Sequence, residues 1–174
     1  MDVEAHILLC ASPLPAAELL AGASRPTTGA LASFLGLTRT PGLRGRPVAR
    51  LEFEAFQPMA RRVLADLCRE AQARAGGALA CVVVAHRLGA VPLGEASLLV
   101  AVSSPHRAEA LAAVPWLVDA IKARAPVWKK EVYTAEGGGG GEWVGACTAS
   151  GGHGGGATDE RSQCAPENKR NICC

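Results

Sequence analysis

The sequence contains few aromatic residues, no long apolar run and little net charge. Phe, Trp and Tyr make up 4% of its 174 residues, whereas hydrophobic residues as a whole make up 49% and are sufficient for a core. No stretch approaches the roughly 20 consecutive apolar residues that span a bilayer, so we expect no membrane association. Eighteen basic and sixteen acidic residues leave a formal net charge of +2. This is too little to drive binding to nucleic acid.

Signals for export and for a bound metal are also absent. Asp2 and Glu4 lie where a secretory signal would carry positive charge, so we expect a soluble cytosolic protein. The seven cysteines are odd in number, include no C-x-x-C pair and form no Cys/His cluster with ligand spacing. We therefore expect no disulfide framework, no metal site and no cofactor. Cys68 and Cys81 lie in apolar periodic segments and are predicted to be buried thiols.

Short apolar segments alternate with segments of helical periodicity, which predicts an α+β domain with a mainly antiparallel or mixed sheet. The expected order of elements is β-α-β-β-α-β-β-α-β. Strands are predicted at residues 5–11, 29–37, 48–56, 79–85, 96–102 and 127–134, and helices at 15–22, 58–75 and 104–125. From Glu136 onward the sequence is rich in glycine. We expect a folded domain over residues 1–145 and a disordered low-complexity tail over residues 146–174.

The segment from Ser103 to Glu131 carries most of the candidate site residues. Ser104 followed by Pro105 predicts a helix start, with an N-cap hydroxyl and proline at the first position. His106 and Arg107 would then lie in the first helical turn, where free backbone N–H groups favour an anion. The alternative is that Arg107 is merely exposed to solvent and His106 merely packs.

The second group of cations lies at the other end of the same helix and on the strand that follows. Lys122 is one turn from the predicted helix end, where a lysine also commonly complements the helix dipole. Lys129 and Lys130 are adjacent on a strand and must point to opposite faces. We predict that Lys129, on the face shared with Val127 and Glu131, is the one that points into a pocket.

Helix length separates these two groups of cations. His106 and Lys122 are sixteen residues apart, which is roughly 24 Å along an unbroken helix. Pro115 predicts a kink or a lost hydrogen bond between them. Unless the helix breaks there, the protein has either two sites or one site assembled across a dimer. We favour the dimer.

Two further segments carry basic residues. Arg39, Arg44 and Arg46 lie in a Pro- and Gly-bearing loop that is predicted to be mobile. This loop could close over an anionic ligand or could equally be a solvated surface loop. His86 and Arg87 follow a predicted strand, but the glycines after them indicate turn architecture. No P-loop, G-x-S-x-G elbow or dinucleotide fingerprint is present.

Several motifs together resemble one family. The sequence contains AHRLGAVPLGEASLLVAVSSPHRAEAL, then DAIKARAPVWKKEVY and then EWV, preceded by GALASFLGLTR and LEFEAFQPMA. In this order and spacing they closely resemble the large, catalytic subunit of molybdopterin synthase, with the eukaryotic members nearest. The similarity runs from about Gly29 to Trp143, roughly two-thirds of the chain.

The resemblance implies an α/β hammerhead-type fold and a homodimer of large subunits at the centre of a heterotetramer. A small ubiquitin-like subunit at each end carries a C-terminal Gly-Gly thiocarboxylate. The implied reaction transfers two sulfurs to cyclic pyranopterin monophosphate and gives the dithiolene of molybdopterin. By motif, Lys122 and Lys129 would be catalytic, and the other substrate-binding residues would be His106, Arg107, Lys130, Glu131 and Arg39. A lysine, unlike an arginine, can lose its proton when desolvated.

An alternative from a different class is a catalytically silent scaffold that binds a ubiquitin-like tail through the same basic groove. The presence of lysine at both Lys122 and Lys129 favours the enzyme, because docking alone could use either lysine or arginine.

Overall fold

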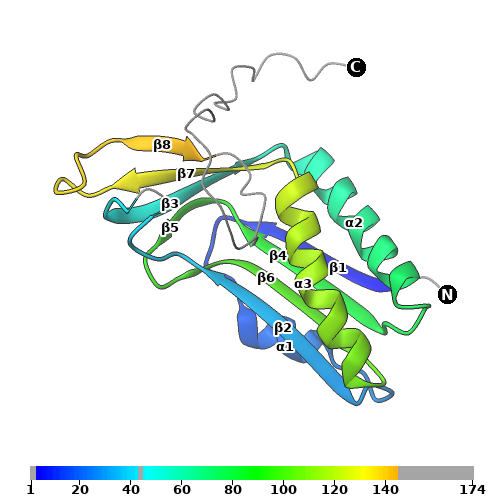
Figure 1. Ribbon diagram of the computed structural model, residues 1–174. Coiled ribbons are helices and arrows are strands. Elements are labelled where there is room, and N and C mark those ends of the chain that lie inside the picture. The colour runs from blue at the N-terminus through cyan, green and yellow to red at the C-terminus, as the bar shows by residue number, and fades with distance from the viewer. Residues whose placement is uncertain (1–2, 43–44, 145–174) are drawn as a thin grey trace, which may run out of the picture.

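The computed structural model describes residues 3–42 and 45–144, and its elements follow the α+β order that the sequence predicts. The chain runs β1 (Glu4–Cys10), α1 (Ala16–Ala23), β2 (Ala30–Leu37), β3 (Val48–Ala55), α2 (Gln57–Arg74), β4 (Cys81–Arg87), β5 (Gly89–Pro92), β6 (Ala96–Ser104), α3 (Arg107–Arg124), β7 (Val127–Tyr133) and β8 (Gly141–Val144). Figure 1 shows these elements with α2 and α3 side by side. The α+β class is confirmed.

The strands form two four-stranded sheets. The first has the order β1-β4-β6-β2 and the second the order β5-β3-β7-β8. Strand β1 pairs with β4 in parallel, whereas β2 with β6 and β4 with β6 are antiparallel. All pairs in the second sheet are antiparallel. The sheets are therefore mixed and antiparallel, as predicted.

The core lies on both faces of the first sheet because its central strands β4 and β6 are buried at nearly every position and mostly apolar. On β4, Val82 and Val84 pack under α2 and α3, whereas Val83 and Ala85 pack under α1. This alternation follows from the two-residue period of a strand. Cys68 and Cys81 are buried free thiols, as predicted. Burial raises the pKa of the Cys68 thiol to about 12.

The edge strand β2 is covered on one face and open on the other. Ala30, Ala32 and Phe34 pack against the core beneath α3. Leu31, Leu35 and Leu37 point the other way and are 44%, 41% and 57% exposed. Helix α1 covers β4 and β6 on that face but has few contacts with β2. An edge strand with a row of exposed leucines is a surface suited to pairing with another chain.

Helix α3 begins later than the sequence predicts. Its N-cap is His106, and Ser104 still belongs to β6, where it pairs with Ala30 of β2. The Ser104 hydroxyl donates to the carbonyl of His106 and therefore does not cap an N–H group. The predicted Ser104 cap is wrong because the long-range pairing with β2 extends β6 past the local helix signal.

Pro115 does not break α3, which is continuous over 18 residues. Pro115 and Leu111 are both exposed, so the Leu111 carbonyl that loses its helical partner faces water. Leu111 is 60% exposed and lies at the margin of the buried face formed by Val114, Leu117 and Ile121. The helical spacing of Leu111, Val114, Leu117, Val118 and Ile121 predicts one apolar face, and for Leu111 this prediction is wrong.

Strands β5 and β8 were not predicted from the sequence. Strand β5 occupies the segment that the glycines marked as turns, and it pairs with Arg50 to Phe53 of β3. Strand β8 contains Trp143 and Val144 and pairs with β7. The predicted disordered tail lies outside the described residues. In the part of the chain that the structure describes, no helix is long and apolar enough to cross a membrane.

Candidate functional site

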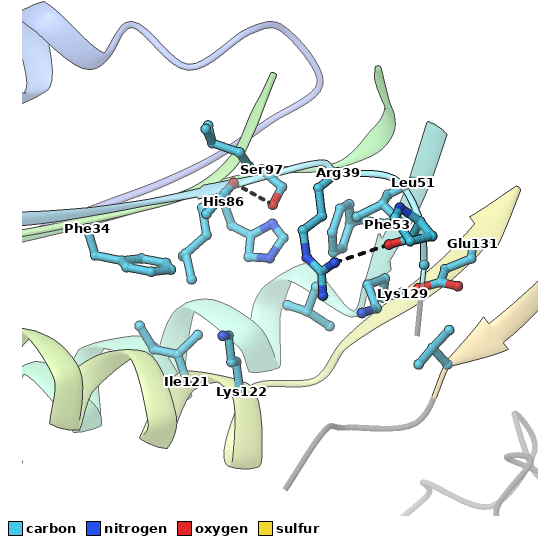
Figure 2. A pocket seen from close by; sticks show the side chains of 17 residues that line it. Phe34, Arg39, Leu51, Phe53, His86, Ser97, Ile121, Lys122, Lys129 and Glu131 are labelled. Atoms are coloured by element: carbon cyan, nitrogen blue, oxygen red, sulfur yellow. Dashed lines mark hydrogen bonds between the residues drawn. The ribbon is translucent and has the colours of Figure 1, made fainter. Parts of the chain in front are cut away.

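A pocket of about 360 Å³ lies where the two sheets meet the C-terminal end of α3. Every strand except β1 and β5 contributes to it, together with α3 and the loop after β2 (Figure 2). Its walls are Phe34, Gly36, Leu37, Arg39, Pro41, Gly42, Leu51, Phe53, His86, Ser97, Leu98, Ile121, Lys122, Val127, Lys129, Glu131 and Val144. The fold thus gathers residues that are more than 100 positions apart in the sequence.

Three cations from three different elements line this pocket. Lys122 comes from the last turn of α3, and its Nζ lies 5.6 Å from the centre of the Phe34 ring. Lys129 comes from β7, and Arg39 comes from the loop after β2. The Arg39 Nη1 donates to the Pro41 carbonyl at 3.1 Å. In Figure 2 all three side chains point into the same space.

Adjacent residues of β7 face opposite ways, as predicted. Lys129 and Glu131 line the pocket, whereas Lys130 does not. The Lys130 Nζ instead lies 3.6 Å from Glu52 Oε2 and 6.0 Å from the centre of the Trp143 ring. The structure therefore separates Lys130 from the group of residues with which it was predicted to act.

Glu131 places a buried carboxylate among these cations. It is 3% exposed, and the Tyr133 hydroxyl donates to its Oε2 at 3.2 Å. Burial and the nearby Glu131 carboxylate raise the pKa of Tyr133, so that its hydroxyl stays protonated as a donor. A Cβ on Gly42 would collide with the Glu131 carboxylate and with Val48. The lack of a side chain at Gly42 therefore lets the loop that carries Arg39 pack directly on Glu131.

His86 is a pocket residue to which the sequence assigned no role. It is buried, its Nδ1 lies 2.8 Å from the Arg87 carbonyl, and its ring meets Phe53 edge-on at 4.9 Å between centroids. Burial lowers the pKa of His86, which favours the neutral imidazole. The alternation of β4 was the available signal, because His86 continues the face of Val82 and Val84.

His106 and Arg107 are not in this pocket. Both are exposed at the N-terminal end of α3, whereas Lys122 is in its last turn. Because α3 is unbroken, its length keeps these residues roughly 24 Å from Lys122 within one chain. The structure thus brings together Arg39, Lys122, Lys129 and Glu131, and it leaves His106 and Arg107 apart from them.

Arg46 is a tether in this structure. Its guanidinium lies 3.7 Å from the centre of the Tyr133 ring, donates to the Gly137 carbonyl at 2.6 and 2.9 Å and pairs with Glu142 at 2.9 Å. It thereby fixes the loop before β3 to the β7–β8 hairpin, away from the pocket lining. Arg44 lies outside the described residues. Over residues 3–42 and 45–144, no group of acidic, histidine and cysteine side chains could hold a metal ion.

This arrangement defines an α+β domain whose cation-lined pocket can bind an anionic ligand. The family model described as MoaE protein matches residues 9–124, and the chain belongs to this family. It is 50% identical over 111 residues to the molybdopterin synthase catalytic subunit of Arabidopsis thaliana, covering 64% of this chain and 54% of that protein. It is 40% identical over 124 residues to the catalytic subunit of Dictyostelium discoideum, covering 71% and 77%.

The fold is similar to that of solved members of the family. The molybdopterin synthase structure from Staphylococcus aureus matches with a TM-score of 0.70 and 30% identity, over 83% of this chain and 98% of that one. The MoaE protein from Burkholderia ambifaria matches with a TM-score of 0.67 and 29% identity, over 82% and 90%. The chain spans 54% of the length of the Arabidopsis relative and 35% of a Drosophila willistoni relative.

Proposed function

We propose that this protein is the catalytic, sulfur-transferring subunit of a molybdopterin synthase. The observation that carries the proposal is the convergence of Lys122, Lys129 and Arg39 on one pocket in a chain of the MoaE family. The proposed substrate is cyclic pyranopterin monophosphate, and the sulfur donor is the thiocarboxylated C-terminus of a small ubiquitin-like subunit.

The charges of the pocket support this pair of substrates. A thiocarboxylate and a cyclic phosphate are both anions, and three cations against the Glu131 carboxylate leave the pocket positive. Each transfer forms a C–S bond at a pterin carbon in place of a C–O bond, whose oxygen leaves as water or stays on the phosphate of the opened ring. The C–S bond of the tail breaks, and water supplies the oxygen of the resulting carboxylate. In this scheme Lys122 either accepts the acyl group or positions the sulfur, and Lys129 binds the anionic groups.

The shape of the pocket supports entry of a glycine tail. Phe34, Leu98, Ile121 and Val144 give it apolar walls, and its volume is about 360 Å³. A Gly-Gly segment has no side chains, so its extended backbone can enter a narrow space that larger residues would not fit. The partner in this proposal is therefore the small subunit with a C-terminal Gly-Gly.

We further propose that a second copy of the chain completes the site, with His106 and Arg107 of one copy facing Lys122 of the other. The exposed leucines of β2 support this arrangement, because antiparallel pairing of β2 with its counterpart would bring the leucines of both copies together on one face of the joined sheet. Such pairing sets Ala30 of one copy beside Leu37 of the other. Because Ala30 pairs with Ser104 in β6, it would also carry His106 toward the pocket of the neighbour.

The test is reconstitution of the reaction. The protein is incubated with the thiocarboxylated small subunit and cyclic pyranopterin monophosphate, and the dithiolene product is measured. We expect product that depends on both components. Binding of the small subunit without any product would contradict the enzyme and favour the catalytically silent scaffold.

A further inference from the structure

His86 is the one pocket residue with a titratable ring, and the sulfur-transfer scheme above gives it no task. It is 7% exposed, yet it lines the pocket with Arg39 and Lys122. Figure 2 shows its ring directed into the space that Lys122 enters from α3. A buried histidine that only packed would not need to face this space.

The hydrogen bond between the His86 ring and the Arg87 carbonyl determines which ring nitrogen carries the proton. The partner of Nδ1 is the Arg87 carbonyl, which can only accept, so Nδ1 carries the proton. In the neutral ring Nε2 then has a lone pair and acts as an acceptor. In the described part of the chain the bond to Arg87 is the ring's one hydrogen bond. The edge contact with Phe53 holds the ring in this orientation.

The other polar side chains of the pocket differ from His86 in the hydrogen bonds that they can make. Arg39, Lys122 and Lys129 can only donate. The other side-chain acceptors are the carboxylate of Glu131, which already receives the Tyr133 hydroxyl, and the hydroxyl oxygen of Ser97, which donates to the Gly36 carbonyl. An anion made only of acceptor oxygens or sulfur would gain nothing from Nε2. The lone pair is suited to a ligand that also carries an N–H or O–H group.

We propose that His86 Nε2 accepts a hydrogen bond from an N–H or O–H group of the bound ligand and so helps to select and position it. The proposal rests on the function proposed above. Both partners in that reaction offer such a donor: the ring N–H and hydroxyl groups of the pterin, and the backbone N–H groups of the glycine tail. The shared chemistry is a neutral donor at the His86 face of the pocket.

Two substitutions separate this role from a structural one. In His86→Asn the side-chain amide can still donate to the Arg87 carbonyl but does not reach the Nε2 position. In His86→Gln the longer side chain carries an acceptor oxygen to that position. Ser97→Ala is the matched control, because Ser97 also lines the pocket but its hydroxyl donates to the Gly36 carbonyl at 3.1 Å.

Binding is measured for three probes: cyclic pyranopterin monophosphate, a synthetic peptide with the C-terminal sequence of the small subunit, and inorganic phosphate. We expect His86→Asn to weaken binding of one of the first two by about tenfold. His86→Gln should recover most of this loss, and phosphate binding should not change. A loss confined to the pterin assigns the donor to the pterin, and a loss confined to the peptide assigns it to the tail.

Unchanged binding of both ligands to His86→Asn, with the wild type active, would overturn this inference and leave the proposed function intact. An inactive wild type would overturn the proposed function instead. A measurement on the wild type covers the case in which the variants do not fold. The ¹⁵N resonance of His86 Nε2 should shift when the ligand is added, and a resonance that does not move would also overturn the inference.

Discussion

The two ends of helix α3 carry cations in very different surroundings. At its C-terminal end Lys122 faces a walled pocket that contains Arg39, Lys129 and a buried carboxylate. At its N-terminal end His106 and Arg107 are exposed, and neither of them lines the pocket that contains Lys122. One end of α3 is thus part of a pocket that this chain forms by itself, whereas the other is an exposed surface that, in the proposed dimer, faces a second copy.

The largest effect on activity is expected from a substitution at the C-terminal end of α3, which faces the pocket. Lys122→Ala should lower product formation by about 100- to 1,000-fold, because it removes a positioned cation from the pocket in which we propose that the reaction occurs. Arg124→Ala is the matched control, since Arg124 lies in the same helical turn but pairs with Glu70 on the surface at 2.6 Å. The control should change the rate less than twofold. Equal losses in both variants would mean that the pocket is not the site of reaction.

The next test concerns strand β2, through which we propose that a second copy of the chain reaches the N-terminal end of α3. Leu35→Asp should convert a dimer into a monomer, because it puts a charge on the open face of the edge strand β2. Activity should fall at least about tenfold, since His106 and Arg107 would no longer reach a neighbouring pocket. Leu111→Asp changes a leucine on α3 that is more exposed, 60% against 41% for Leu35, and should leave the dimer intact. Sedimentation measures both, and a dimeric Leu35→Asp protein would contradict the β2 interface.

Complementation tests whether the two ends act across the dimer. Arg107→Ala and Lys122→Ala proteins are each expected to be nearly inactive. After random exchange, half of the dimers contain one of each, and one of their two sites carries neither substitution. The mixture should therefore recover about a quarter of the wild-type activity. No recovery, with exchange shown by mass spectrometry, would place each site within one chain.

The sequence predicted the residues around the pocket correctly where the periodicity of a strand or helix decides which way a side chain points. The alternation of a strand was enough to put Lys129 and Lys130 on opposite faces, and the structure confirms it. Buried thiols at Cys68 and Cys81 followed from apolar periodicity in the same way. These features depend on neighbours in the sequence, so the sequence is sufficient to predict them.

Features that depend on distant pairing could not be predicted in this way. Ser104 looks like a helix cap, but its pairing with Ala30 keeps it in β6. His86 looked like part of a turn because the pocket that it faces is formed by α3 and β7, which come later in the chain. Arg46 looked like a candidate ligand residue, but it is held by the β7–β8 hairpin 91 positions away.

The Arg46 tether supports the pocket wall without entering it. Arg46→Ala should lower the free energy of unfolding by about 1–2 kcal/mol, because it removes a cation–π contact and hydrogen bonds that are partly exposed. Arg50→Ala is the control, since Arg50 pairs with Glu52 at the surface and should cost less than about 0.5 kcal/mol. Urea unfolding measures both. Equal stabilities would show that the hairpin holds without the tether.

The smallest expected effect is an acid sensitivity of folding stability that comes from His86 in the pocket. Burial lowers the pKa of His86 below 6.5 in the folded chain, so below pH 6.5 the unfolded chain binds more protons. Stability should fall as the pH falls, by at most about 1 kcal/mol at pH 6 relative to pH 8 from this residue. His86→Gln should remove that part of the slope. Equal slopes of unfolding free energy against pH in wild type and His86→Gln would show that His86 is not held neutral.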